Sequence, residues 1–197
     1  MKLTSASFVK GATNASHFPD SVLPEVAFVG KSNVGKSSLI NGLLNRKSLV
    51  RTSSTPGHTR EINFFLINQE FHLVDLPGYG FAKGGPHLTK GWEDLVRSYL
   101  EPRHQLKAVV MIVDIRHPPG PLDRRMHDWL VQLKQPFVLA VNKADKLSNN
   151  QVAKQMAMWR KALETPATLL PCSARLKTGL EPIWDFLEQQ LAATPTP

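Results

Sequence analysis

The sequence predicts an α/β domain with a mostly parallel sheet and helices on both of its faces. Compact apolar runs alternate with amphipathic helical patterns from residue 25 onward, and a Gly-rich turn follows the first apolar run directly. The chain has 197 residues, of which 42% are hydrophobic and 20% charged. This length suits one domain that buries a sizeable core, and this composition excludes disordered and fibrous chains.

Six apolar runs are the predicted strands, because each is short and rich in Val, Ile, Leu or Phe. They are Glu25–Val29, Ile62–Ile67, Phe71–Asp75, Lys107–Asp114, Phe137–Val141 and Ala167–Pro171. Only residues 68–70 separate the second run from the third, which permits a hairpin but no crossover helix. We therefore expect a six-stranded sheet with one antiparallel edge pair.

Five helices are predicted, four of them between these strands and one after the last strand. Each shows apolar residues at helical spacing, within residues 39–44, 88–99, 122–133, 152–163 and 180–187. The four Trp residues lie on the last four stripes, so we interpret them as packing residues rather than platforms for stacking bases. Residues 45–60 and 76–87 are long polar loops containing Gly and Pro, and loops of this length are more often functional.

The charge, the lack of long apolar runs and the single cysteine limit which partners, membrane segments and disulfides we expect. The formal net charge is +8, and the first 60 residues hold eight Lys or Arg against two acidic residues, which suits a polyanionic partner. No run of 18 apolar residues and no signal-peptide pattern occurs, so we expect a cytoplasmic protein without a membrane segment. A single cysteine, Cys172, excludes internal disulfides, and nothing suggests more than a monomer.

A phosphate-binding loop follows the first predicted strand. The motif G-x-x-x-x-G-K-[ST] is formed by Gly30, Lys31, Ser32, Asn33, Val34, Gly35, Lys36 and Ser37, with Ser38 after it. Its glycines let backbone N–H groups surround a β-phosphate, and the following helix directs its positive end at the same oxygens. Lys36 is expected to bridge the β- and γ-phosphates, and the Ser37 hydroxyl to bind Mg²⁺.

A second motif selects the base. Asn142, Lys143, Ala144 and Asp145 follow the strand Phe137–Val141, where doubly wound folds bind ligands. The Asp145 carboxylate can accept two hydrogen bonds from guanine that adenine cannot offer. Lys143 can lay its stem along the base, and Asn142 can tie this loop to the phosphate loop. Ser173 and Ala174 can present a backbone N–H to guanine O6.

Two further segments are expected to respond to the γ-phosphate. In Asp75-Leu76-Pro77-Gly78, Asp75 can hold Mg²⁺ through a water and the Gly78 N–H can meet the phosphate. Upstream, Thr59 is the preferred second Mg²⁺ ligand and Thr55 the alternative. The neighbours of Thr59 are also expected at the nucleotide: Gly57, His58, Arg60 and Glu61. These loops would order with GTP and loosen with GDP.

No general base stands out. Tyr79 follows Gly78 where many GTPases place a water-orienting glutamine, so we expect slow hydrolysis supported by Lys36, Thr59, Gly78 and Mg²⁺, with help from a partner. The side-chain oxygen of Asn33 could hold a K⁺ ion near the phosphates.

The motifs GKSNVGKSS, TPGHT, DLPG, NKAD and CSA occur in an order that resembles the EngB (YihA, YsxC) family of translation-factor-related small GTPases. The segments PEVAFVGKSNVGKSSLIN and DLPGYGFA are similar to this family specifically. The resemblance implies a Ras-like sheet. We expect a single G domain at residues 25–192, after an N-terminal extension (1–24) and before a tail (193–197) that the sequence predicts to be frayed. The resemblance implies Mg²⁺-dependent GTP and GDP binding, with Ser37 and Thr59 as Mg²⁺ ligands. Cys172 departs from the family, which often has Ser there, so at this position we expect the backbone rather than the side chain to contact the nucleotide.

The resemblance also implies action in assembly of the large ribosomal subunit and a link to septum formation in cell division. Candidate contacts with rRNA or ribosomal proteins are the N-terminal extension, the two loops, and the basic residues Arg46, Lys47, Arg51 and Arg60. Two other readings stay open. One is a guanine-nucleotide-binding module acting on division proteins with little hydrolysis, and the other, disfavoured by N-K-x-D, is a small kinase.

Overall fold

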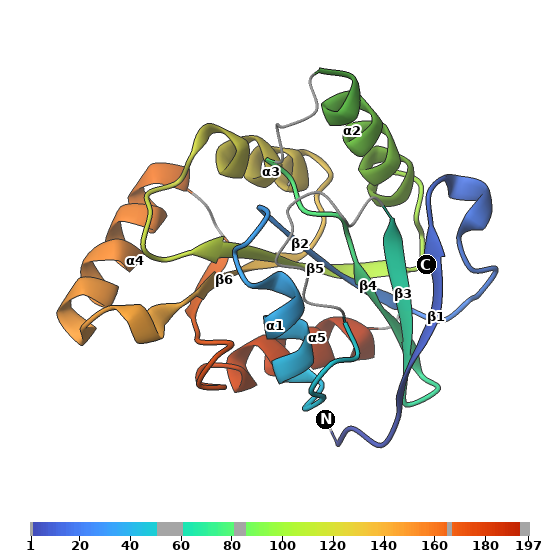
Figure 1. Cartoon of the computed structure of the whole chain (residues 1–197), viewed down its shortest axis with the longest axis horizontal. Helices are drawn as coiled ribbons and strands as arrows, with labels where there is room; N and C mark the ends of the chain where they lie inside the picture. Colours follow the sequence, from blue (N-terminus) through green and yellow to red (C-terminus); the bar gives the residue numbers. More distant parts are fainter. Residues whose placement is uncertain (1, 51–60, 81–85, 165–166, 194–197) are drawn as a thin grey trace.

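This computed structural model describes residues 2–50, 61–80, 86–164 and 167–193. Within these residues the strands form one seven-stranded sheet (Figure 1). The strand order is β1-β3-β4-β2-β5-β6-β7. The strands are β1 (Ala6–Ala12), β2 (Glu25–Gly30), β3 (Ile62–Ile67), β4 (Phe71–Asp75), β5 (Leu106–Asp114), β6 (Phe137–Asn142) and β7 (Thr168–Pro171). Strands β4, β2, β5, β6 and β7 are parallel, so their carboxyl ends meet at one edge.

The α/β fold class is confirmed, but the expected strand number was wrong by one. β1 lies within residues 1–24 and pairs antiparallel with β3, which itself pairs antiparallel with β4 through the predicted hairpin. The pattern of β1 conceals it, because a bulge between Phe8 and Lys10 breaks the alternation and its side chains are mostly part-exposed. The antiparallel region therefore holds three strands.

Five α-helices cover the two faces of the sheet (Figure 1). They are α1 (Lys36–Leu43), α2 (Pro86–Leu100), α3 (Pro121–Gln132), α4 (Asn149–Leu163) and α5 (Glu181–Ala192). Two short 3₁₀ turns, η1 (Ala15–His17) and η2 (Ala144–Lys146), complete the secondary structure of the described residues. Helices α2, α3 and α4 pack in one apolar core and α1 and α5 in the other, as expected for alternating strands and helices.

The tryptophans are packing residues, as the helical stripes predict. Trp159 is buried, and Trp92, Trp129 and Trp184 are half-buried against the two cores. Three of their indole N–H groups donate to backbone carbonyls, those of His117, Pro77 and Leu43. No described helix has the length and apolar character needed to cross a membrane.

A buried ion pair fixes the amino end of β2. The Glu25 carboxylate is fully buried and accepts hydrogen bonds from the guanidinium of Arg103 at 2.6 and 3.0 Å and from the Tyr99 hydroxyl at 2.8 Å. Arg103 also donates to the carbonyl of Pro19, so the same group holds the segment after β1. The three donors compensate the cost of burying this carboxylate.

Arg103→Met should therefore lower the free energy of unfolding by about 3 kcal/mol, because Glu25 would stay buried without its charge partner. Arg125→Met is the control. Arg125 pairs with Glu93 but is 64% exposed, so its loss should cost less than about 1 kcal/mol. Urea unfolding of both variants measures the difference, and equal small losses would contradict a stabilising role for Arg103.

Candidate functional site

The phosphate loop runs from the carboxyl end of β2 into α1. Asn33 and Gly35 have left-handed backbone angles, with φ of +67° and +93°, and Gly35 is the N-cap of α1. A Cβ atom on Gly35 would lie 2.6 Å from the Asn142 amide nitrogen, so only glycine fits here. The loop thus combines the curled backbone and the helix N-terminus that suit a phosphate group.

Lys36 and Asp75 form a buried ion pair behind this loop. The Lys36 ammonium donates to the Asp75 carboxylate, and the side chains are 9% and 3% exposed. β2 and β4 bring the two together, because Phe28 of β2 lies opposite Asp75. Burial raises the pKa of Asp75, and the charge of Lys36 counteracts that rise.

The oxygen donors at this point fit Mg²⁺. Ser37 lies half-buried on the first turn of α1, next to Lys36, and Asp75 supplies a carboxylate. Among the described residues no group of three or more His, Cys, Asp or Glu could hold a metal. These residues therefore suit an ion shared with phosphate oxygens rather than one held by protein alone.

The segment after Asp75 lies along the phosphate loop. Leu76 and Tyr79 donate their backbone N–H groups to the carbonyls of Phe28 and Gly30 at 3.0 and 3.2 Å. Ser32 donates its N–H back to the carbonyl of Tyr79 at 2.9 Å. These hydrogen bonds hold Gly78 against Ser32. Gly78 is the residue whose N–H the sequence predicts to contact the γ-phosphate.

The side chain of Tyr79 packs against residues of α2 and α3. It is 4% exposed, its hydroxyl donates to Asp123 at 2.8 Å, and its ring lies 6.1 Å from that of Trp92. Burial, followed by the charge of Asp123, raises the pKa of Tyr79 well above its usual value. Trp92 in turn donates to the Pro77 carbonyl at 2.8 Å. Tyr79 is therefore held by side chains of both helices.

The side chain of Asn41 in α1 holds the first part of the long loop that follows this helix. The Asn41 side chain donates to the Val50 carbonyl at 2.7 Å and accepts from its N–H at 2.9 Å. Gly57, His58, Thr59 and Arg60, with Thr55 and Arg51, lie outside the described residues. Glu61 is described and exposed, and its carboxylate lies against Gly11 of β1.

Asn142 connects the base-selecting motif to two other segments of the site, the phosphate loop and the segment after β7. Its amide group donates to the Val34 carbonyl of the phosphate loop at 2.9 Å and accepts from the Ala174 N–H at 3.0 Å. Lys143 has a φ of +68° and donates to the Asn33 carbonyl at 2.8 Å. The motif that begins with the last residue of β6 therefore lies beside the phosphate loop, as the sequence predicts.

The carboxylate expected to read the base is preorganised. Ser173 donates to Asp145 at 2.7 Å and Arg175 at 2.9 Å, and the Asp145 side chain is 2% exposed. The hydrogen bond from Ser173, followed by that from Arg175, lowers the pKa of Asp145. The sequence carries no local signal for this role of Arg175, because an arginine after Ser-Ala has many ordinary surface roles.

Cys172 is a packing residue. It is 1% exposed, and burial raises the pKa of its thiol to about 12, so a nucleophilic role is excluded at neutral pH. Its Sγ lies 4.0 Å from the Asn142 amide oxygen.

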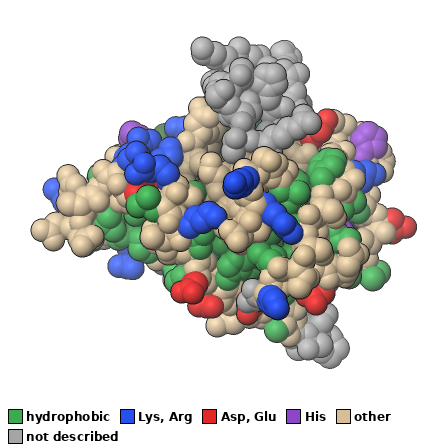
Figure 2. All heavy atoms as spheres, turned by 60° about the horizontal axis from the view of Figure 1, so that its bottom comes forward, with side chains coloured by type: hydrophobic (Ala, Val, Ile, Leu, Met, Phe, Trp, Pro, Cys, Tyr) green, Lys and Arg blue, Asp and Glu red, His purple; other side chains and the backbone are tan. Residues whose placement is uncertain are grey.

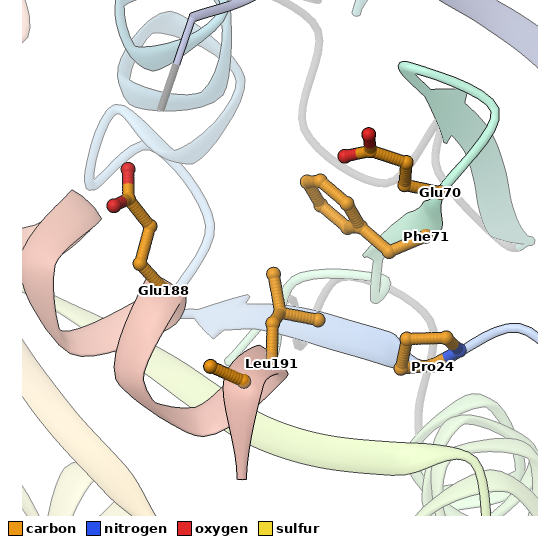
Figure 3. A pocket seen from close by; sticks show the side chains of 6 residues that line it. Pro24, Glu70, Phe71, Glu188 and Leu191 are labelled. Carbon is orange, nitrogen blue, oxygen red and sulfur yellow. The ribbon is translucent and has the colours of Figure 1, made fainter. Parts of the chain in front are cut away.

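A cavity of about 300 Å³ lies elsewhere, and Figure 3 shows the side chains that line it. These are Pro24, Glu70, Phe71, Glu188, Leu191 and Ala192. Pro24 precedes β2 and Phe71 begins β4, so this cavity lies at the amino end of the parallel strands. It is therefore separate from the phosphate loop, which follows the carboxyl end of β2.

Comparison with known proteins gives one consistent result. A family model described as "50S ribosome-binding GTPase" matches residues 25–143. The chain is 49% identical to "Probable GTP-binding protein EngB" of Geobacter metallireducens, over 98% of this chain and 95% of that protein. It is 44% identical to the protein of that name in Clostridioides difficile, over 96% and 95% of the two chains.

Solved structures agree on the fold. A "probable GTP-binding protein engB" matches with a TM-score of 0.73 and 27% identity, over 85% of this chain and 98% of that one. The structure of Era with MgGDPNP and a fragment of 16S ribosomal RNA matches with a TM-score of 0.70 and 24% identity, over 89% and 59% of the two chains. This second likeness shows the fold alone.

Replacing Gly35 by Ala should weaken nucleotide binding at least about tenfold, because the new methyl group requires a strained backbone and displaces Asn142. Titration with a fluorescent GDP analogue measures the loss. Gly91→Ala is the matched control, since a Cβ there meets no atom within 4 Å and alanine favours the helix. Unchanged affinity in Gly35→Ala would contradict the described loop geometry.

Proposed function

This chain belongs to the EngB family of GTP-binding proteins, and we propose that it acts as a nucleotide-controlled switch on a precursor of the large ribosomal subunit. Family membership makes it a GTP-hydrolysing enzyme with a Ras-like P-loop domain. The ribosomal target is supported by the family description, and a role in cell division and septation belongs to the same proposal. We also propose that it works in the cytoplasm, as a monomer.

Guanine selection is proposed from the hydrogen bonds of Asn142. Since this one side chain ties Val34 to Ala174, the phosphate loop and the Ser173–Ala174 segment are held at a fixed spacing around the base. Asp145 then faces guanine N1 and the 2-amino group as an ionised acceptor. The Ala174 backbone and the stem of Lys143 complete the proposed contacts with the base.

The phosphates are proposed to lie on the N-terminus of α1. Lys36 donates to Asp75 in this structure, and the triphosphate oxygens offer its ammonium a more strongly charged set of acceptors. Asp75 is then available to hold a water of Mg²⁺, whose charge neutralises that developing during phosphoryl transfer. Ser37 and Thr59 are the proposed protein ligands of Mg²⁺, and the exposed Asn33 is the proposed ligand of K⁺.

We propose that intrinsic hydrolysis is slow, and the position of Tyr79 supports this proposal. Because its hydroxyl and ring are engaged by Asp123 and Trp92, no described side chain after Gly78 is placed to orient the attacking water. Lys36, Gly78 and Thr59 supply electrostatic stabilisation, and a bound partner would supply the rest.

The ribosomal contact is proposed to use basic side chains near the loops. Lys and Arg side chains lie near the centre of the face in Figure 2 and in a cluster at its left, whereas Asp and Glu lie mostly toward the margin. Arg46 and Lys47 are exposed just after α1. Such side chains suit the phosphates of rRNA.

Asp145→Asn should weaken GTP binding by about a hundredfold and shift preference toward xanthine nucleotides, because it replaces a charged acceptor of two hydrogen bonds by an amide. Competition titrations with GTP and XTP measure both effects. Asp128→Asn, on the exposed side of α3, is the control. Unchanged GTP affinity in Asp145→Asn would refute the base assignment.

Co-sedimentation tests the target. With a non-hydrolysable GTP analogue the protein should be retained on immature large subunits, whereas with GDP it should stay in the supernatant. Lys36→Ala, which should lose tight nucleotide binding, provides the control. Equal retention in both nucleotides would instead indicate a binding module. Absence of binding in both would redirect the search to division proteins.

A further inference from the structure

We propose that Asp114, a residue with no motif of its own, positions Lys143 for recognition of the nucleotide base. The inference rests on the proposed role of Lys143 at guanine. It assigns to the end of β5 a positioning residue for a site otherwise built from the loops after β2, β6 and β7.

Strand register places Asp114 beside the base-recognition motif. β5 and β6 are parallel neighbours, and Asp114 lies opposite Asn142, the residue before Lys143. The Lys143 ammonium lies 2.9 Å from the Asp114 carboxylate, and the two side chains are only 24% and 12% exposed. Asp114 ends β5 and Lys143 directly follows β6, so the two neighbouring strands bring this part-buried pair together, unlike a pair of mobile surface side chains.

Lys143 is held at two points. Its left-handed backbone directs the side chain back over the phosphate loop, where its Cε lies 3.9 Å from the position that a Gly35 Cβ would occupy. The ammonium donates to the Asn33 carbonyl and also faces Asp114. Because Lys143 is already held in one rotamer, ordering this side chain costs little conformational entropy when a base binds.

Asp114 is itself oriented without Lys143. The Arg116 guanidinium donates to both carboxylate oxygens at 2.9 and 2.7 Å, and the Arg116 backbone N–H donates at 3.1 Å. Burial alone would raise the pKa of Asp114, but the hydrogen bonds from Arg116 and Lys143 hold it well below its usual value. Asp114 is therefore a fixed negative charge at neutral pH, and its attraction for Lys143 does not depend on a bound ligand.

The functional consequence is preorganisation. Asn33 contributes only a carbonyl dipole to Lys143, whereas Asp114 contributes a full charge. Without Asp114, the ammonium would be held by one neutral acceptor, and the stem along the base would fluctuate.

Asp114→Asn tests this role, because asparagine keeps the size of the side chain and an acceptor for the Arg116 N–H while it removes the charge. The GDP dissociation constant of the full chain should rise about tenfold, with the KM for GTP rising and kcat unchanged. Asp128→Asn, the same substitution on the exposed side of α3, is the control and should leave the constant unchanged.

A double-mutant cycle separates positioning from a general structural role. Lys143→Met keeps the aliphatic stem without the ammonium, and in that background Asp114→Asn should change GDP affinity less than about twofold. Equal losses in both backgrounds, or no loss in the single variant, would overturn the inference. If Asp114→Asn has no effect while Lys143→Met and Asp145→Asn weaken binding, the proposed guanine site stands without Asp114. If Lys143→Met also has no effect, the proposed role of Lys143 fails with it.

Discussion

The hydrogen bonds of one buried amide hold the site together. Asn142 is 1% exposed and connects the phosphate loop, through Val34, to the backbone of Ala174. Its two partners lie 108 and 32 residues away along the chain, so no local preference can bring them together. Both ends of the Asn142 amide are used, which fixes its orientation and excludes the isosteric Asp, because a carboxylate cannot donate to Val34.

Charge is buried at both ends of the sheet, with different consequences. At the amino end, Glu25 receives three hydrogen bonds from Arg103 and Tyr99 and is fully compensated. At the carboxyl end, Asp75 has a raised pKa, and among the residues that the structure describes its one charged partner is Lys36. The Glu25 carboxylate has all its hydrogen bonds made within the protein, so this pair stabilises the fold. The Asp75 carboxylate can still accept further hydrogen bonds, so it can exchange partners when phosphates compete for Lys36.

The sequence was sufficient for the elements whose signals are local. Apolar runs and helical stripes identified β2 to β7 and the five α-helices, because burial on one or both faces leaves a periodic pattern. It also predicted the tie between Asn142 and the phosphate loop, since the carboxyl ends of parallel strands converge. β1 was missed because a part-exposed edge strand with a bulge has no clean period. Asp114, Asp123 and Arg175 were missed because their importance depends on register and on neighbours distant in sequence.

β1 also determines what the sheet offers to other chains. It pairs along β3, whose residues INFFLI would otherwise form an apolar outer strand with unpaired backbone groups. The edge that β1 presents instead is interrupted by its bulge and carries Lys10, so it is a poor template for a further strand. β1 thus protects the sheet from intermolecular β-pairing, and a chain that begins after Ala12 would expose an aggregation-prone edge even though every nucleotide motif remained intact.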